Sequence, residues 1–118
     1  MPNPPDLLML RDKLRAFAAE RDWDQFHSPK NLSMALMVEV AELMEHFQWL
    51  TEAQSANLAF EKRPAVAEEL ADTLLYLIRL SDKLDVDLLE AALDKLEKNA
   101  AKYPAEQVRG SANKYSEY

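Results

Sequence analysis

Cysteine is absent from this chain of 118 residues, and glycine occurs once, as Gly110. Without cysteine there is no disulfide framework, no thiolate metal site and no thiol redox chemistry. A single glycine excludes phosphate-binding loops of the Walker and Rossmann types, because those loops need glycine where the backbone approaches a phosphate. Any nucleotide chemistry must therefore use a different kind of site.

Long apolar runs and a basic surplus are also missing. No run reaches the roughly eighteen apolar residues that a bilayer-spanning helix needs. The N-terminal MPNPPDLLML has neither the basic flank nor the cleavage pattern of a signal peptide. The formal net charge of −7 argues against a general nucleic-acid binder. We expect a cytoplasmic protein without membrane or nucleic-acid partners, in which divalent cations bridge the acidic body to any polyphosphate ligand.

Apolar periodicity and capping residues predict helices along the whole chain, with no competing strand pattern. Asp6 is the expected N-cap of the first helix, and Asp85 or Asp87 that of the last. Thr51 and Gln54 resemble a capping box that opens a short helix. The principal helices are expected at about 7–22, 31–50, 64–84 and 88–102.

These helices predict an all-α protein, a four-helix bundle formed by a single domain over residues 1–104. Residues 105–118 are polar and are expected to form a C-terminal tail without a core of their own. The helices at 31–50 and 64–84 are apolar almost all round, which implies burial on more than one side. We therefore expect an obligate oligomer with these two helices near the subunit interface.

The helix expected at 31–50 carries acids within an otherwise apolar pattern. At about 100° per residue, Glu39 and Glu42 lie on one narrow stripe. His46 and Trp49 continue that stripe toward the end of the helix. Because this helix contains no Lys or Arg, its acids have no cationic partner within the helix.

The helix expected at 64–84 repeats this arrangement. Glu69 and Asp72 are again three residues apart, so both carboxylates point the same way, and Tyr76 and Arg79 continue their stripe. Two such helices packed side by side bring four carboxylates together. Removing a carboxylate from water costs several kcal/mol unless something compensates it.

A bound cation explains these paired acids better than the alternatives do. Single helical acids usually face solvent, and a buried salt-bridge network has only Arg79 to balance four carboxylates. A di-iron centre needs Glu-x-x-His on two helices, a pattern that is absent here. Oxygen ligands without obligatory nitrogen or sulfur favour Mg²⁺, with Mn²⁺ as a substitute. The expected metal ligands are Glu39, Glu42, Glu69 and Asp72.

Aromatic residues near the acids suggest the second half of a nucleotide site. Protein-bound Mg²⁺ commonly keeps positions for water and substrate phosphates, which points to phosphate-ester or anhydride hydrolysis. Trp49 and Tyr76 extend the acid stripes, and the ring-rich loop 23–27 is expected to close over them. Stacking of a base on an aromatic ring contributes about 1–3 kcal/mol. Ordinary core packing remains open for these two rings, as does a purely structural role for His27.

Four segments together resemble the all-α MazG-type nucleoside triphosphate pyrophosphohydrolase family, and most closely its dCTP pyrophosphatase branch. These segments are RDWDQFHSPKNL, EVAELMEHFQW, EELADTLLYL and KLEKNAAKYP. The resemblance implies Mg²⁺-dependent hydrolysis of a deoxynucleoside triphosphate, with dCTP or base-modified dCTP preferred. Water would attack the α-phosphorus and release pyrophosphate and the monophosphate, in a role of nucleotide-pool cleansing.

The resemblance also implies residue roles and a quaternary structure. As a separate hypothesis about the mechanism, we expect Glu39 or Glu42 to deprotonate the attacking water. Contacts to base and sugar would come from Trp23, Asp24, Gln25, Phe26, His27, Trp49 and Tyr76, and contacts to the phosphates from Lys30, Asn99, Lys102 and Tyr103. Members of the family form homotetramers built as pairs of dimers. The animal dCTP enzymes have a nucleotide-contacting histidine where this chain has Leu14, which leaves the preferred base open.

Two other hypotheses compete with this one. A non-catalytic helical interaction module would use the acids as an anionic docking stripe and would show no Mg²⁺-dependent thermal shift. A triphosphohydrolase would release triphosphate. Enzymes of that kind have metal sites built from His and Asp, and this chain offers only two histidines as ligands, His27 and His46.

Overall fold

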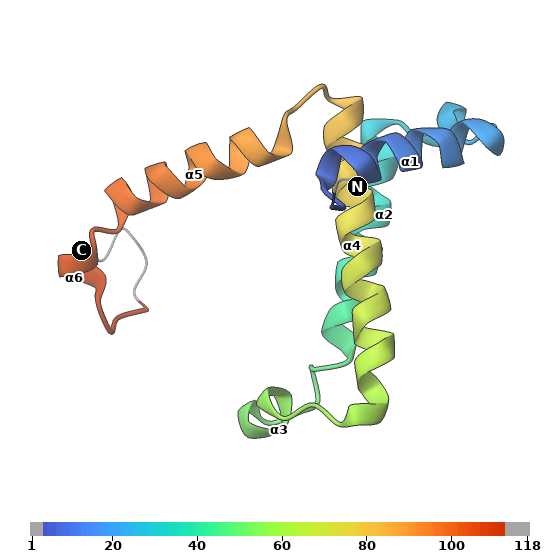
Figure 1. Ribbon diagram of the computed structural model, residues 1–118. Helices are drawn as coiled ribbons and strands as arrows, with labels where there is room; N and C mark the ends of the chain where they lie inside the picture. Colours follow the sequence, from blue (N-terminus) through green and yellow to red (C-terminus); the bar gives the residue numbers. More distant parts are fainter. Residues whose placement is uncertain (1–3, 113–118) are drawn as a thin grey trace. The chain divides into compact units, whose positions relative to one another are not determined.

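The computed structural model describes residues 4–112, and every regular element within this range is helical (Figure 1). The prediction of an all-α fold is thus confirmed. The chain divides into two compact units, Met1–Asp85 and Val86–Tyr118. The domain proposed for 1–104 and the tail proposed for 105–118 remain predictions, and their ends, residues 1–3 and 113–118, lie outside the described part.

The first unit contains three long helices and shorter helical segments. In chain order these are α1 (Leu7–Glu20), the 3₁₀ helix η1 (Asp24–Phe26), α2 (Pro29–Glu45), α3 (Glu52–Ala56), the 3₁₀ helix η2 (Phe60–Lys62) and α4 (Arg63–Lys83). The second unit contains α5 (Leu88–Lys102) and the short α6 (Ala105–Val108), which lies within the predicted tail. None of the helices in residues 4–112 is long and apolar enough to cross a membrane.

The helix starts follow from short polar side chains that accept backbone hydrogen bonds. Asp6 accepts from the Met9 amide at 2.8 Å, as its position predicts. Thr51 and Gln54 form the reciprocal capping box, and Asp87 caps α5. These three predictions are confirmed.

The predicted end of the acid-bearing helix is wrong. α2 stops at Glu45 rather than Leu50, and the amides of His46, Phe47 and Leu50 bond three residues back, as His46 does to Leu43. The reason lies in Thr51, whose capping role requires an extended backbone (φ −73°, ψ 165°), so the chain must leave the helix before it. Trp49 therefore does not continue the helical stripe, whereas His46, the C-cap of α2, still has helical dihedral angles (φ −67°, ψ −18°).

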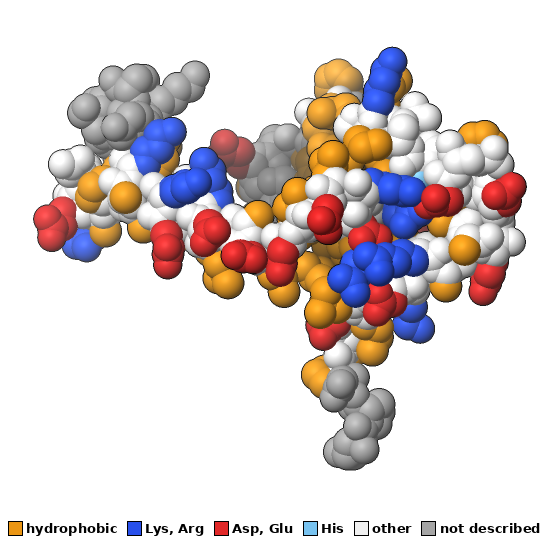
Figure 2. All heavy atoms as spheres, turned by 90° about the horizontal axis from the view of Figure 1, so that it is seen from above, with side chains coloured by type: hydrophobic (Ala, Val, Ile, Leu, Met, Phe, Trp, Pro, Cys, Tyr) orange, Lys and Arg blue, Asp and Glu red, His pale blue; other side chains and the backbone are white. Residues whose placement is uncertain are grey.

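The helices α2 and α4 lie side by side, and α1 packs against α4 (Figure 1). The buried apolar core of the described residues is small: Ala18 from α1, Leu32 from α2, and Val66 and Ile78 from α4. Many larger apolar side chains stay exposed, and Figure 2 shows such side chains at the surface. On α2 and α4 they include Met34, Met37, Val38, Met44, Leu70 and Leu74.

A charged pair fastens α1 to α4. Arg15 donates two hydrogen bonds to Asp82, from Nε to Oδ2 at 2.7 Å and from Nη2 to Oδ1 at 2.5 Å. The Asp82 side chain is only 12% exposed, so its charge depends on these donors. The bond from Arg15 holds the pKa of Asp82 below its ordinary value.

We expect Asp82→Asn to lower the free energy of unfolding by about 2 kcal/mol at neutral pH, because Arg15 loses a bidentate carboxylate. The folded pKa is depressed, so this stabilisation is present above the ordinary pKa of 3.8 and is lost as pH falls further. Urea unfolding at neutral and acidic pH measures it. Asp12→Asn is the control: Asp12 also contacts Arg15 but is 62% exposed, so its change should stay within about 0.5 kcal/mol.

Candidate metal centre and adjoining pocket

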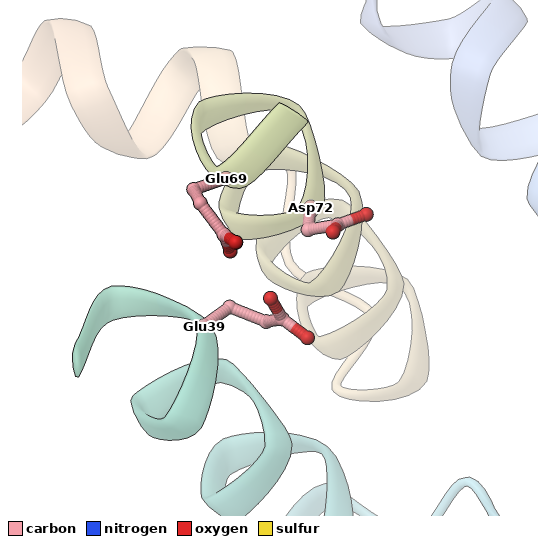
Figure 3. Close-up of side chains that lie close together, drawn as sticks. All are labelled: Glu39, Glu69 and Asp72. Carbon is pink, nitrogen blue, oxygen red and sulfur yellow. The ribbon is translucent and has the colours of Figure 1, made fainter. Parts of the chain in front are cut away.

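Three carboxylates converge between α2 and α4. Glu39 points from α2 toward Glu69 and Asp72, which lie on successive turns of α4 (Figure 3). One carboxylate oxygen from each residue lies within 4.8 Å of the others. The two helices thus bring together the acids that the i,i+3 spacing placed on their facing sides.

Two oxygens in this cluster lack any hydrogen-bond partner. Glu39 Oε2 and Glu69 Oε2 are buried, and neither accepts a hydrogen bond. Among the described residues, no ion pair involves Glu39, Glu69 or Asp72. Because an unpaired buried carboxylate is costly, the cluster fits a hard cation bound by oxygen ligands.

The electrostatics of the cluster support the same conclusion. Burial, followed by the neighbouring carboxyl groups of Glu69 and Glu42, raises the pKa of Glu39 to about 7. Burial and the Glu42 carboxyl also raise the pKa of Glu69. Without a cation, the raised pKa values favour protonated Glu39 and Glu69 carboxyl groups, and a bound cation would displace these protons.

Glu42 lies close enough to affect both neighbours, yet it is not one of the three residues whose oxygens converge. Its carboxylate belongs to the same acidic region on α2, one turn beyond Glu39. The assignment of Glu42 as a metal ligand remains a prediction.

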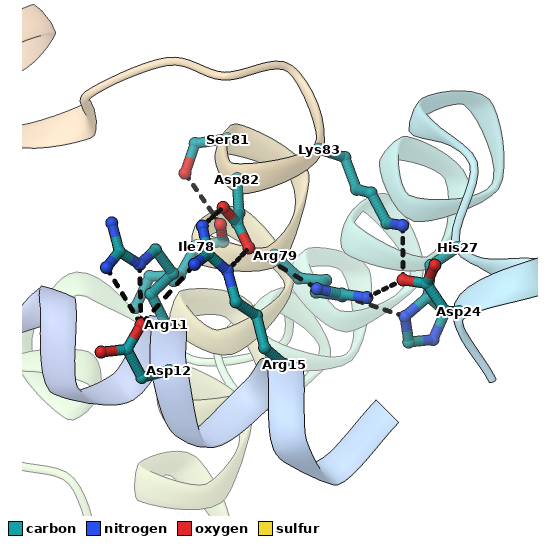
Figure 4. A network of polar contacts seen from close by, with 10 residues as sticks. All are labelled: Arg11, Asp12, Arg15, Asp24, His27, Ile78, Arg79, Ser81, Asp82 and Lys83. Carbon is teal, nitrogen blue, oxygen red and sulfur yellow. Dashed lines mark hydrogen bonds and ion pairs between the residues drawn. The ribbon is translucent and has the colours of Figure 1, made fainter. Parts of the chain in front are cut away.

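Arg79 does not act as the cationic partner of these acids. By its spacing, Arg79 lies on the same helical stripe as Glu69 and Asp72, and it was the only cation on that stripe that could balance the carboxylates. In the structure it instead pairs with Asp24 and Asp82 (Figure 4). The salt-bridge alternative for the acid cluster thereby loses its cation.

A pocket of about 430 Å³ adjoins the cluster and shares Asp72 with it. Three predicted substrate-binding residues line it: Trp23, His27 and Tyr76. The Trp23 ring meets the Phe17 ring edge-on, with centroids 5.6 Å apart. The remaining lining is mostly apolar and comes from α1, α2 and α4, namely Leu10, Lys13, Leu14, Phe17, Leu32, Leu75 and Arg79. Among the α1 residues of this lining, the sequence pointed only to Leu14, and it gave no signal for Leu10, Lys13 or Phe17.

Other predicted binding residues lie outside this pocket lining. Asp24 pairs with Arg79 and Lys83, and Gln25 donates to the backbone and side chain of Asp22. Phe26 is 59% exposed and Trp49 is 87% exposed. Lys30 lies exposed in the first turn of α2, and Asn99, Lys102 and Tyr103 lie at the C-terminal end of α5, in the second unit.

The fold and this site define the class of protein: the chain belongs to the MazG-like family, whose sequence profile matches residues 34–118. It is 45% identical to dCTP pyrophosphatase 1 of Homo sapiens over 115 residues, which span 96% of this chain and 68% of that protein. The protein of the same name from Bos taurus is 45% identical over 117 residues, spanning 98% and 69%.

A solved structure agrees with these sequence relatives. The crystal structure of a pyrophosphatase from Archaeoglobus fulgidus superposes with a TM-score of 0.80 at 38% sequence identity. The superposition covers 88% of this chain and 97% of that one. The family resemblance and the predicted MazG-like fold are thereby confirmed.

Glu39 should stabilise the metal-free protein progressively more as pH falls from about 7 toward 4.5, whereas His27, with its lowered pKa, acts in the opposite direction below its ordinary value of 6.5. Glu39 keeps its proton up to about pH 7 when folded, but releases it near pH 4.5 when unfolded, so the folded state binds more protons in this window. The melting temperature in EDTA, measured across that range, tests this. Glu39→Gln should flatten the slope, whereas Glu68→Gln, on the exposed face of α4, should leave it unchanged.

Proposed function

We propose that this chain hydrolyses a deoxynucleoside triphosphate at the α-phosphorus, releasing the monophosphate and pyrophosphate, with dCTP or a base-modified dCTP preferred. The observation that carries this proposal is the pair of partnerless carboxylate oxygens, of Glu39 and Glu69, beside a ring-lined pocket. The relationship to dCTP pyrophosphatase 1 over nearly the whole chain supports the choice of reaction and substrate.

The cation of this proposal is Mg²⁺, with Mn²⁺ as a substitute, held by Glu39, Glu42, Glu69 and Asp72. When bound, it supplies positive charge that polarises phosphoryl oxygens and lowers the pKa of water. All four ligands are carboxylates, the donor type that this ion prefers, and the oxygens of three of them already converge.

The remaining steps involve the side chains of this protein. Glu39 or Glu42 accepts a proton from the attacking water while the oxygen of that water bonds to the α-phosphorus. The bond from the α-phosphorus to the bridging oxygen breaks, and its electron pair leaves with pyrophosphate. Trp23, His27 and Tyr76 hold the base and sugar in the pocket that they line.

Predicted binding residues outside the pocket complete the proposal. Asp24, Gln25, Phe26 and Trp49 would contact base and sugar. Lys30, Asn99, Lys102 and Tyr103 would contact the phosphates, where cationic and polar donors offset the charge that develops during the reaction. The physiological role that fits this reaction is cleansing of the cytoplasmic nucleotide pool.

We further propose a homotetramer, built as a pair of dimers, in which α2 and α4 face other subunits. The support is the exposure of large side chains such as Met37 (65%) and Leu70 (54%) on these helices. Apolar area on this scale is typical of an interaction surface.

Product analysis tests the reaction directly. Incubation with each of the four common deoxynucleoside triphosphates, and with base-modified dCTP, should yield pyrophosphate in the presence of Mg²⁺ and none in EDTA. We expect dCTP or its modified form to show the highest kcat/KM. Release of triphosphate would identify a triphosphohydrolase instead, and absence of both turnover and a Mg²⁺-dependent thermal shift would favour the docking module.

Glu42→Gln tests the acids individually. Because it removes a carboxylate from the proposed metal and base positions, kcat should fall by at least about a hundredfold, while circular dichroism and oligomer mass stay unchanged. Glu45→Gln, one turn later on α2 and exposed, is the matched control and should keep full activity. Near-normal turnover of the Glu42 variant would place the reaction elsewhere.

Native mass spectrometry and light scattering test the assembly. We expect a mass four times that of the 13.5 kDa chain, and Met37→Glu together with Leu70→Glu should reduce it to dimers or monomers. A wild-type protein that is monomeric at micromolar concentration would contradict the tetramer, and the proposed reaction would be unaffected by that result.

A further inference from the structure

Arg79 is the most deeply buried charged residue of the described chain, at 6% exposure. Each side of its guanidinium faces a partner (Figure 4). Nε donates to Nδ1 of His27 at 3.1 Å, and Nη2 donates to Oδ1 of Asp24 at 2.5 Å. Nη1 lies 3.6 Å from Oδ2 of Asp82. The orientation of the guanidinium is therefore fixed by three groups at once.

The contact with His27 has a chemical consequence. A guanidinium has only donors and keeps its proton at any physiological pH, so Nδ1 of His27 must be the acceptor and carry no hydrogen. The single proton of the neutral ring then resides on Nε2. Burial, together with the charges of Arg79 and Lys83, lowers the pKa of His27, while the charge of Asp24 opposes this shift. The neutral ring is thus favoured.

The same residues fasten η1 to α4. Lys83 lies one turn after Arg79 and donates from Nζ to the same oxygen of Asp24, at 2.5 Å. Both cations therefore hold the loop through Asp24, and Arg79 also holds it through His27. Trp23 and His27, at the two ends of this segment, line the pocket beside Asp72.

We propose that Arg79 is a positioning residue for substrate recognition. It holds His27 in the Nε2–H tautomer, so the ring presents one hydrogen-bond donor to the pocket. The ligand group that this donor suits is a neutral acceptor, a base carbonyl or a sugar oxygen, rather than a phosphate. The identity of the ligand as a nucleotide rests on the proposed function.

Lysine cannot replace arginine in this role. A lysine ammonium is a compact charge without a rigid planar fork, so it cannot serve His27, Asp24 and Asp82 together. Arg79→Lys should therefore release the ring while keeping the local charge. Arg15→Lys is the matched control, because Arg15 also pairs with Asp82 but has no bond to His27.

The first experiment measures the tautomer of His27 by ¹⁵N NMR of the full chain without nucleotide. The chain has two histidines, so His46→Gln assigns both. We expect His27 to be a single Nε2–H tautomer in the wild type and in Arg15→Lys, and a mixture in Arg79→Lys. A protonated Nδ1 in the wild type, or an unchanged tautomer in Arg79→Lys, overturns the proposal.

The second experiment separates binding from turnover. His27→Asn keeps an acceptor near the place of Nδ1 but lacks the Nε2 donor, so KM should rise about tenfold while kcat changes less than about threefold. Arg79→Lys should raise KM in the same way. The KM of the double variant should stay within about threefold of that of His27→Asn, because both changes remove the same interaction. A KM in the double variant equal to the product of both effects overturns the proposal.

The two experiments keep this proposal distinct from the proposed function. The NMR result needs no nucleotide, so it holds or fails even if no triphosphate is hydrolysed. If Arg79→Lys does not fold, the proposal is tested by the tautomer of His27 in the wild type and by the KM of His27→Asn. An Nε2–H tautomer combined with an unchanged KM in His27→Asn refutes the recognition role while leaving the hydrolysis intact.

Discussion

Mutual repulsion among carboxylates that meet between α2 and α4 is the constraint on which the rest of the site depends. Glu39 and Glu69 bury oxygens without partners, and the proximity of Asp72 adds further negative charge. Such a cluster persists only because the apolar faces of α2 and α4 hold the backbones in place. The fold thus brings these carboxylates together in advance, and the proposed cation would offset their mutual repulsion.

The helix α4 links the acid cluster to the rest of the site. Asp72 lies in the cluster, Tyr76 lines the pocket one turn later, and Arg79 and Lys83 hold the loop whose ends, Trp23 and His27, line the pocket. One helix therefore sets the distance between the acid cluster and the residues that line the pocket. Sites supported in this way keep their geometry better than sites formed by loops alone.

Sequence patterns predicted the part of the site that depends on local spacing. Glu39, Glu69 and Asp72 converge because helical periodicity fixes their direction, and the caps at Asp6 and Thr51 follow from local hydrogen bonds. The contacts of Arg79 with Asp24 and His27 were not predictable in this way, since these residues lie 55 and 52 residues away. The error at Trp49 arose from extending one periodic stripe past the point where the cap at Thr51 requires the helix to end.

The register of α4 has a consequence for how chain length can vary in related sequences. Asp72, Tyr76 and Arg79 share one face only while the number of residues between them is conserved. Insertion of a single residue there would rotate all later side chains by about 100°, and would turn the loop-holding cations away from the pocket. An insertion in the connection between α2 and α4 would instead leave the spacing of Asp72, Tyr76 and Arg79 within α4 unchanged.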